Sequence, residues 1–163
     1  MSEPALDALL HETRRFDPPA DLARDANATA ATYDAAAADR LGWWEEQARG
    51  LTWSAPWAEV LDWQLPFAKW FVGGRLNACV NAVDRHVDAG AGNKVAFHWI
   101  GDGEREKRDV TYADLKREVC KAANALTSLG VATGDRVTIY MPMIPETIVT
   151  MLACARIGAP HNV

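Results

Sequence analysis

The second half of the chain alternates between strand-like runs and helical patterns, and this rhythm restricts the fold more than any other feature. Residues 95–100 (Val-Ala-Phe-His-Trp-Ile) and 136–140 (Arg-Val-Thr-Ile-Tyr) have the length and composition of strands. Residues 104–109 alternate in charge and are predicted to form a solvated hairpin. Residues 159–163 begin a further strand. Because helical patterns separate the later strands, the order predicts a parallel α/β layout with right-handed crossovers.

Two helices are predicted between these strands. The first starts at Thr111, where Asp114 completes a variant capping box, and ends at Gly130. Its apolar face repeats at helical spacing: Leu115, Val119, Ala123, Leu126 and Leu129. The second starts at Pro145 and ends at Gly158. Its buried face is predicted to consist of Ile148, Met151, Leu152 and Ala155.

The first 50 residues are predicted to be helical. Residues 4–15 have leucines on one side of a helix. A second helical stretch runs from Pro19 to Arg49, with a break near Asn27, and Gly50 ends it.

Residues 51–75 are rich in aromatic side chains, including Trp53, Trp57, Trp63 and Trp70. Pro56 and Pro66 prevent one continuous helix. We expect an extended segment that wraps over a larger body and is anchored by its aromatic rings. Stacking on a nucleobase or a sugar is the alternative, but the segment lacks the interleaved basic residues that follow a phosphate backbone.

Residues 77–87 follow the turn at Gly73-Gly74 and have a helical pattern. Val80, Val83 and Val87 share one face of this helix. Its other face is predicted to carry the charged side chains Asp84, Arg85 and Asp88.

Composition and charge exclude several classes of protein. The chain has 163 residues, of which 49% are hydrophobic, and a net charge of −5, so it is globular and not disordered. No apolar run is long enough to cross a membrane, and no secretory signal is present, which predicts a cytoplasmic protein without a membrane partner. The acidic balance disfavours nucleic acid as a partner. Cys79, Cys120 and Cys154 are too few and too far apart for a disulfide framework or a zinc site and are predicted to be buried thiols.

The sequence predicts no catalytic, cofactor-binding or metal-ligating residue. Its glycine turns match neither the dinucleotide fingerprint nor the Walker A spacing, and no Gly-x-Ser-x-Gly nucleophile motif occurs. The four histidines lack a metal-binding spacing, and His86 is interpreted as structural. A site outside these patterns would involve His98 with Asp102, or Tyr140 with Glu146.

Several stretches resemble the opening of the acetyl-CoA synthetases. Residues 66–77 (Pro-Phe-Ala-Lys-Trp-Phe-Val-Gly-Gly-Arg-Leu-Asn) are followed by 81–86 (Asn-Ala-Val-Asp-Arg-His). Residues 130–146 (Gly-Val-Ala-Thr-Gly-Asp-Arg-Val, then Thr, then Ile-Tyr-Met-Pro-Met-Ile-Pro-Glu) and 151–158 (Met-Leu-Ala-Cys-Ala-Arg-Ile-Gly) are also similar. The likeness runs from about Phe16 to Val163. It points to the AMP-forming acyl-CoA synthetases, within the adenylate-forming enzyme superfamily.

The resemblance implies an activity for a parent protein. In that family acetate attacks ATP to give acetyl-AMP and pyrophosphate, and coenzyme A then displaces AMP, with Mg²⁺ assisting. ATP, Mg²⁺ and coenzyme A are thus expected for the parent, and none is expected to bind this chain. The family's phosphate loop, adenine segment, acyl pocket and catalytic lysine do not occur in these residues, so no family site residue is carried over. Residues 161–163 are nearest in sequence to a ligand site, and no contact with a ligand is expected there.

The sequence is therefore interpreted as the truncated N-terminal part of such an enzyme. Residues 1–92 are assigned to a helical, Trp-rich extension, and 93–163 to the first strands and helices of a larger, mostly parallel-sheet AMP-binding domain. The chain alone is expected to be catalytically inert. Its expected partner is the C-terminal remainder of the parent protein, and without it the chain is expected to self-associate through an exposed sheet edge. Two alternatives remain open: a propionyl-CoA synthetase, or a stand-alone α/β interaction module without enzymatic activity. The Phe97-His98-Trp99 strand favours acetate.

Overall fold

The computed structural model describes residues 14–103 and 106–163. Its contacts divide the chain into two compact units, residues 1–43 and 44–163, which are described separately. The helix predicted over residues 4–15 lies outside the described residues except for positions 14 and 15, which are not helical.

The helical stretch predicted between Pro19 and Arg49 consists of α2 (Ala20–Arg24), α3 (Ala30–Ala38) and α4 (Arg40–Arg49), the last of which continues into the second unit. The predicted break near Asn27 is confirmed. A second break falls at Asp39, whose carboxylate accepts a hydrogen bond from the Gly42 N–H at 2.9 Å. Asp39 thus satisfies one of the free amides in the first turn of α4.

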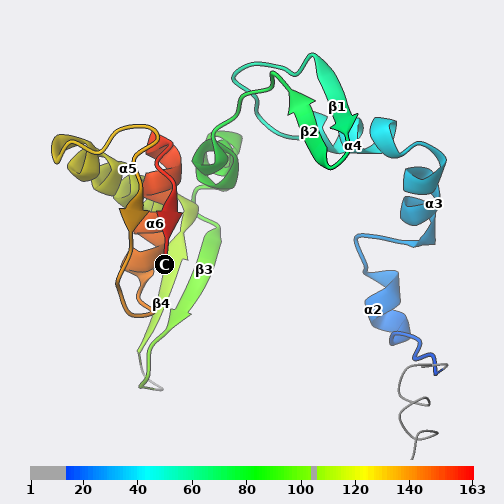
Figure 1. Cartoon of the computed structure of the whole chain (residues 1–163). Helices are drawn as coiled ribbons and strands as arrows, with labels where there is room; N and C mark the ends of the chain where they lie inside the picture. Colours follow the sequence, from blue (N-terminus) through cyan, green and yellow to red (C-terminus); the bar gives the residue numbers. More distant parts are fainter. Residues whose placement is uncertain (1–13, 104–105) are drawn as a thin grey trace, which may run out of the picture. The chain divides into compact units, whose positions relative to one another are not determined.

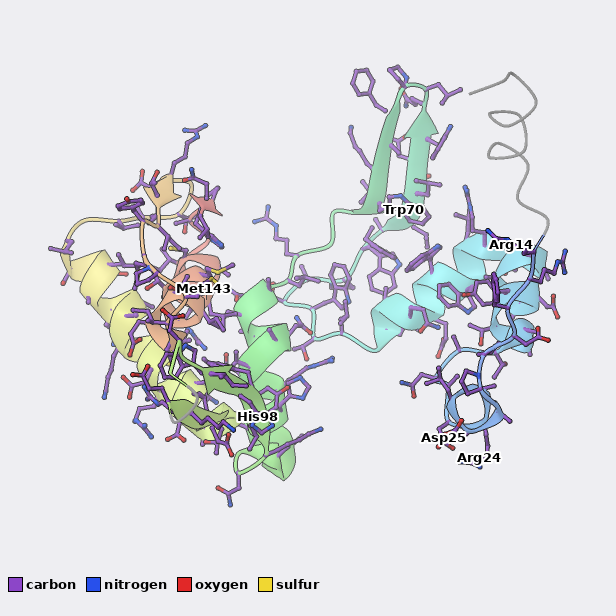
Figure 2. The ribbon with its side chains drawn as sticks, turned by 90° about the horizontal axis from the view of Figure 1, so that it is seen from below. Arg14, Arg24, Asp25, Trp70, His98 and Met143 are labelled. Atoms are coloured by element: carbon purple, nitrogen blue, oxygen red, sulfur yellow. The ribbon has the colours of Figure 1, made fainter. Side chains whose placement is uncertain are left out.

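The aromatic segment after α4 folds into an antiparallel pair, β1 (Glu59–Gln64) and β2 (Phe67–Val72). Trp53, Trp57 and Phe71 pack against one another with ring centroids 5.0–5.6 Å apart. Trp70, labelled in Figure 2, packs edge-on against Trp44 at 6.3 Å. We call residues 53–72 the aromatic hairpin. The prolines break the helix as predicted, but the sequence did not reveal that the two strands pair with each other and that the rings anchor one another.

The core of the second unit lies around two packed helices, α5 (Tyr112–Ser128) and α6 (Pro145–Ile157), which run side by side in Figure 1. β3 (Val95–Ile100) and β4 (Lys107–Thr111) form the hairpin that the sequence predicts, and this hairpin packs against α5. A helical segment over residues 78–91 completes the core; it contains two π-helical stretches, η1 (Val80–Asp84) and η2 (Val87–Ala91), and is kinked at Gly90, whose φ is 86°. The buried side chains of this core are Cys79, Val83, Val110, Leu115, Val119, Ala123 and Ala153.

The predicted parallel pairing is present as a short pair, β5 (Val137–Thr138) and β6 (His161–Asn162), joined through α6. The strand predicted over residues 136–140 is shorter than expected, and the Tyr140 side chain is fully exposed. A parallel strand is stable when neighbours flank it and helices cover it. Among the described residues β5 pairs only with β6, so regular pairing ends early. A larger parallel sheet stays a prediction.

Two predicted helix faces need correction. Leu129 is 82% exposed, because α5 ends at Ser128 and the chain turns away at Gly130, where φ is 95°. In α6 the predicted Leu152 and Ala155 do pack against the core, but the buried positions are Pro145, Thr147, Ala153 and Cys154, and the predicted Ile148 is 37% exposed. Ala153 is the α6 residue in the buried cluster with Leu115, Val119 and Ala123 of α5, and Val149, Leu152 and Ile157 pack against this cluster. Asp84, predicted on the face opposite Val80, Val83 and Val87, is buried.

Gly158 is expected to be essential for the turn from α6 into β6. Its φ of 83° lies in the left-handed region, and a Cβ at this position would lie 3.1 Å from the Thr133 Cγ2 atom. Gly158→Ala is expected to lower the free energy of unfolding by about 1–2 kcal/mol, the usual cost of left-handed backbone for a residue with a Cβ. Urea unfolding followed by far-UV circular dichroism measures this loss.

Gly92→Ala is the matched control. Gly92 has a right-handed φ of −55°, and the nearest atom to its added Cβ would be 3.6 Å away. Its stability should be unchanged or slightly raised. Equal losses in the two variants would contradict the assignment of the Gly158 turn.

Candidate functional site

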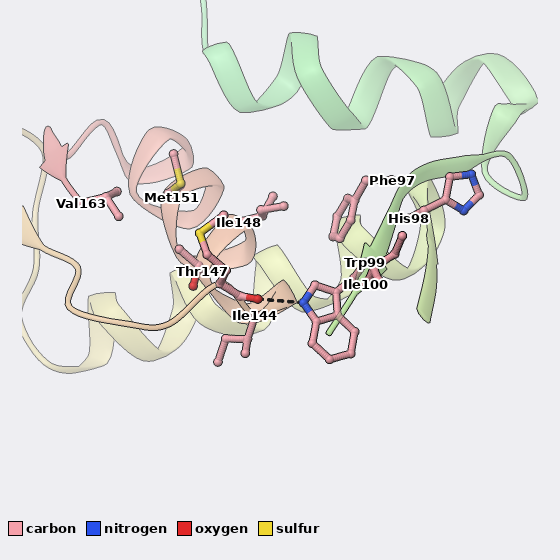
Figure 3. A pocket seen from close by; sticks show the side chains of 10 residues that line it. Phe97, His98, Trp99, Ile100, Ile144, Thr147, Ile148, Met151 and Val163 are labelled. Carbon is pink, nitrogen blue, oxygen red and sulfur yellow. Dashed lines mark hydrogen bonds between the residues drawn. The ribbon is translucent and has the colours of Figure 1, made fainter. Parts of the chain in front are cut away.

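The second unit has an apolar hollow of about 460 Å³ between β3 and α6. Figure 3 shows the Trp99 indole at its edge, where the ring N–H donates to the Met143 carbonyl at 2.8 Å. Most of the lining is apolar: Phe97, Trp99, Ile100, Met143, Ile144, Ile148, Met151 and Val163. Several of these side chains are strongly exposed, including Met143 at 87%.

The hollow has little capacity for catalysis. Besides Trp99, its polar side chains are His98 and Thr147, and the Thr147 hydroxyl already donates to the Pro142 carbonyl at 2.7 Å. The His98 ring points away from the other lining side chains (Figure 3). This arrangement can bury apolar side chains of another segment, but it brings together no nucleophile with a base.

The two residue pairs considered from the sequence are not joined in the structure. His98 Nδ1 lies 2.7 Å from Asp109 Oδ1 across the β3–β4 hairpin, so Asp109 and not Asp102 is its partner. Both side chains of that pair are more than 60% exposed. Glu146 lies 3.7 Å from the Arg108 guanidinium. Within residues 14–103 and 106–163, no hydrogen bond joins Tyr140 to Glu146.

His86 has a structural environment. Its ring stacks on Tyr112 with a centroid distance of 4.7 Å and an interplanar angle of 36°. The ring is half-buried beside the first turn of α5. This agrees with the interpretation of His86 from the sequence.

A partly buried ionic cluster centred on Asp84 joins three helices, and the sequence did not reveal it. Asp84, from the helical segment 78–91, accepts a hydrogen bond from the Arg156 guanidinium of α6 at 2.5 Å. Lys116 of α5 lies 3.4 Å from Asp84 and 2.8 Å from Asp88. Burial would lower the pKa of Arg156, but the hydrogen bond and charge of Asp84, with the nearby thiol of Cys79, outweigh burial and raise it. Arg156, a charged residue in the mostly apolar second half of α6, was the available signal.

The helix ends around this cluster are also tied by Asn77. Its side-chain oxygen accepts hydrogen bonds from the Cys79 and Val80 amides at 2.9 and 3.2 Å. Its side-chain N–H₂ donates to the carbonyls of Ala155 and Arg156 at 3.4 and 3.0 Å. One side chain thus caps the start of the helical segment 78–91 and the end of α6.

The three cysteines are free thiols. Cys79 and Cys154 are fully buried, and burial raises the pKa of both thiols, which disfavours the reactive thiolate. Cys120 is half-buried, which corrects the expectation that all three are buried. In the described parts of the chain, no group of three side chains could hold a metal ion. No helix among these residues is long and apolar enough to span a membrane.

Comparisons with known proteins identify relatives for the whole chain. The family model for the acetyl-coenzyme A synthetase N-terminus matches residues 29–82, and the model for AMP-binding enzymes matches residues 83–163. The acetyl-coenzyme A synthetase of Streptomyces avermitilis is 61% identical over 100% of this chain and 25% of its own length. That of Deinococcus radiodurans is 51% identical over 97% of this chain and 25% of its own length.

A solved structure shares the fold. Acetoacetyl-CoA synthetase from Streptomyces lividans matches with a TM-score of 0.71 and 31% identity, over 86% of this chain and 22% of that chain. The chain therefore spans about a quarter of the length of the curated relatives that it matches. The two family models are adjacent and together cover residues 29–163, which confirms the resemblance found in the sequence. The chain belongs to the acetyl-coenzyme A synthetase family of AMP-binding enzymes.

Proposed function

We propose that these residues are the N-terminal part of an AMP-forming acetyl-CoA synthetase, which joins acetate to coenzyme A through an acetyl-adenylate. The observation that carries this proposal is the 61% identity with an acetyl-coenzyme A synthetase over the whole chain. ATP, Mg²⁺ and coenzyme A would be used by the complete enzyme. The division into an N-terminal extension, residues 1–92, and the start of the AMP-binding domain, 93–163, is part of the same proposal.

We expect the glycine turns at residues 101–103 and 130–134 not to bind a nucleotide. The Gly134 N–H donates to the Gly158 carbonyl at 3.0 Å, and the Gly101 N–H donates to the Glu106 carbonyl at 2.8 Å. The Ala132 N–H donates to the Asp135 carboxylate at 2.8 Å. A phosphate cradle needs backbone amides that converge on the ligand, and these amides already have internal partners. The proposal therefore assigns binding of the nucleotide to residues other than these.

The apolar hollow supports a role as part of a larger domain. The larger part of each relative's sequence lies outside the stretch that matches this chain. We propose that side chains from that part cover the hollow and pair with the open edges of the short sheets. The three free cysteines suit the reducing cytoplasm, where we place the enzyme.

Exchange of pyrophosphate into ATP tests this function. The assay compares the 163-residue chain with the longest chain that its gene encodes, with acetate and with propionate as substrates. We expect exchange only in the longer chain, and faster exchange with acetate. Faster exchange with propionate would favour a propionyl-CoA synthetase, and exchange by the 163 residues alone would contradict the proposed inertness.

The state of the isolated chain is tested separately. Exposed sheet edges and the uncovered hollow are expected to cause concentration-dependent self-association, measured by sedimentation velocity. A monomer that binds no hydrophobic dye, together with an inactive longer chain, would instead favour a stand-alone interaction module.

A further inference from the structure

The helical segment 78–91 presents different chemistry on three sides. One side is apolar: Cys79 and Val83 are completely buried in the core with α5 and α6. The other two sides carry polar side chains that bond to different parts of the second unit. The apolar side accounts for the packing of the helix on the core. The bonds that the two polar sides make have to be explained separately.

The first polar side holds the chain that enters the aromatic hairpin. Asn81 Oδ1 accepts a hydrogen bond from the Thr52 N–H at 2.8 Å, and Asn81 Nδ2 donates to the Thr52 carbonyl at 2.9 Å. One turn further along, Arg85 donates to the Gly50 carbonyl at 2.8 Å. Asn81 thus binds both backbone groups of one residue, as a paired strand would. These bonds fix the residues directly before Trp53.

The second polar side holds the two core helices. Asp84 binds Arg156 of α6 and lies near Lys116 of α5, and Asp88 binds Lys116. Asp84 and Asp88 lie one helical turn apart. Asp84 connects to α6 through Arg156, and both carboxylates connect to α5 through Lys116. The helical segment therefore bonds to the hairpin entry on one side and to α5 and α6 on the other.

The backbone hydrogen bonding of this helix is unusual over residues 80–85, which include side chains from both polar sides. The Arg85 N–H donates to the Val80 carbonyl, five residues earlier, which is π-helical hydrogen bonding. π-helical turns are rare in proteins, and those that do occur are often found at functional positions. This turn includes Asn81 and Asp84, and it ends at Arg85.

We propose that residues 78–91 form a coupling helix, which makes the aromatic hairpin and the α5–α6 core unfold as one cooperative unit. Asn81 and Arg85 are the positioning residues on the hairpin side, and Asp84 and Asp88 are those on the core side. The border between the two matching family models, at residues 82 and 83, falls inside this helix. Residues on both sides of the border between the two family models thus belong to this one helix. This inference does not depend on the proposed enzymatic activity.

Native-state hydrogen exchange of the 163-residue chain at increasing urea concentration tests the coupling. In the unaltered chain, amides of β1 and β2 and amides of residues 115–123 should open with the same free energy and the same urea dependence. In the double variant Asn81→Ala, Arg85→Ala, exchange of the hairpin amides should accelerate about 10-fold or more, while residues 115–123 stay within about twofold. The two regions then unfold separately.

Two further variants complete the test. Asn93→Ala removes an exposed asparagine just after the coupling helix and should leave both regions unchanged. Asn81→Asp keeps the acceptor for the Thr52 N–H and loses the donor to the Thr52 carbonyl. Hydrogen exchange of its hairpin amides should therefore accelerate by an intermediate factor. This variant replaces the double variant in the test if the double variant does not fold. Independent opening of the two regions in the unaltered chain would overturn the proposal. So would equal acceleration of both regions in the double variant.

Discussion

Asp84→Ala is expected to lower the free energy of unfolding by about 3 kcal/mol, the low end of the range for removing one partner of a buried ion pair. The Asp84 side chain is 11% exposed and that of Arg156 is 22% exposed. Within the described part of the chain, the buried Arg156 Nε atom has no hydrogen-bond partner. Without Asp84, the guanidinium would lose its carboxylate in a place that water reaches poorly.

Urea unfolding at neutral pH, followed by far-UV circular dichroism, measures this loss, and Asp88→Ala is the control. Asp88 lies on the same side of the coupling helix and also binds Lys116, but its side chain is 68% exposed. Exposed ion pairs contribute about 0–1 kcal/mol, so Asp88→Ala should cost less than about 1 kcal/mol. Similar losses in the two variants would show that the Asp84 pair is not buried in solution.

A double variant separates the charge from the packing. Asp84→Leu with Arg156→Met replaces both charges by apolar side chains, which is often neutral for a buried pair. We expect the double variant to recover at least half of the stability that Asp84→Ala loses. No recovery would mean that the cluster contributes through hydrogen bonds to its surroundings, not through the pairing of two charges.

The sequence predicted the elements whose signals are local. Thr111 caps α5 because its hydroxyl accepts from the Asp114 N–H at 3.1 Å, which the spacing of the two residues indicates. Pro145 begins α6 and Gly158 ends it in the left-handed region, again from residue type alone. The strand at residues 95–100 and its hairpin were predicted from composition and turn residues.

The features that the sequence did not predict depend on partners distant in the chain. Asp84 was predicted on the face opposite the valines, and the partner that compensates its burial, Arg156, lies 72 positions later in the chain. The pairing of β1 with β2 was not predicted, because neither strand shows a regular alternation of apolar and polar residues, and both contain a tryptophan. The hollow beside β3 could not be predicted either, since it depends on how α6 is rotated about its axis.

The family, by contrast, is identifiable from short stretches of sequence. Residues 66–77 and 130–146 resemble acetyl-CoA synthetases in their amino acids alone, and the relatives confirm that resemblance. The amino-acid sequence, and not the fold, distinguishes acetyl-CoA synthetases from their relatives, because the fold also matches an acetoacetyl-CoA synthetase. The absence of site residues in this chain stays a prediction, which the pyrophosphate exchange experiment tests.

Leu115→Ala is expected to lower the free energy of unfolding by about 3 kcal/mol, within the range for large-to-small changes in a packed core. Leu115 is 4% exposed and belongs to the buried cluster that includes Val83 and Val119. Truncation removes apolar contacts and leaves a cavity that the neighbouring helices can fill only in part.

Leu129→Ala is the matched control for this prediction. Helical spacing places both leucines on the same face of α5, but Leu129 is 82% exposed just beyond the end of the helix. The stability of Leu129→Ala should stay within about 0.5 kcal/mol of the unaltered chain. Measured by urea unfolding, a large loss at both positions would mean that Leu129 is covered in solution, as the apolar repeat of the sequence indicates. A large loss at Leu115 alone would show that the end of α5, and not the apolar repeat, decides which leucines belong to the core.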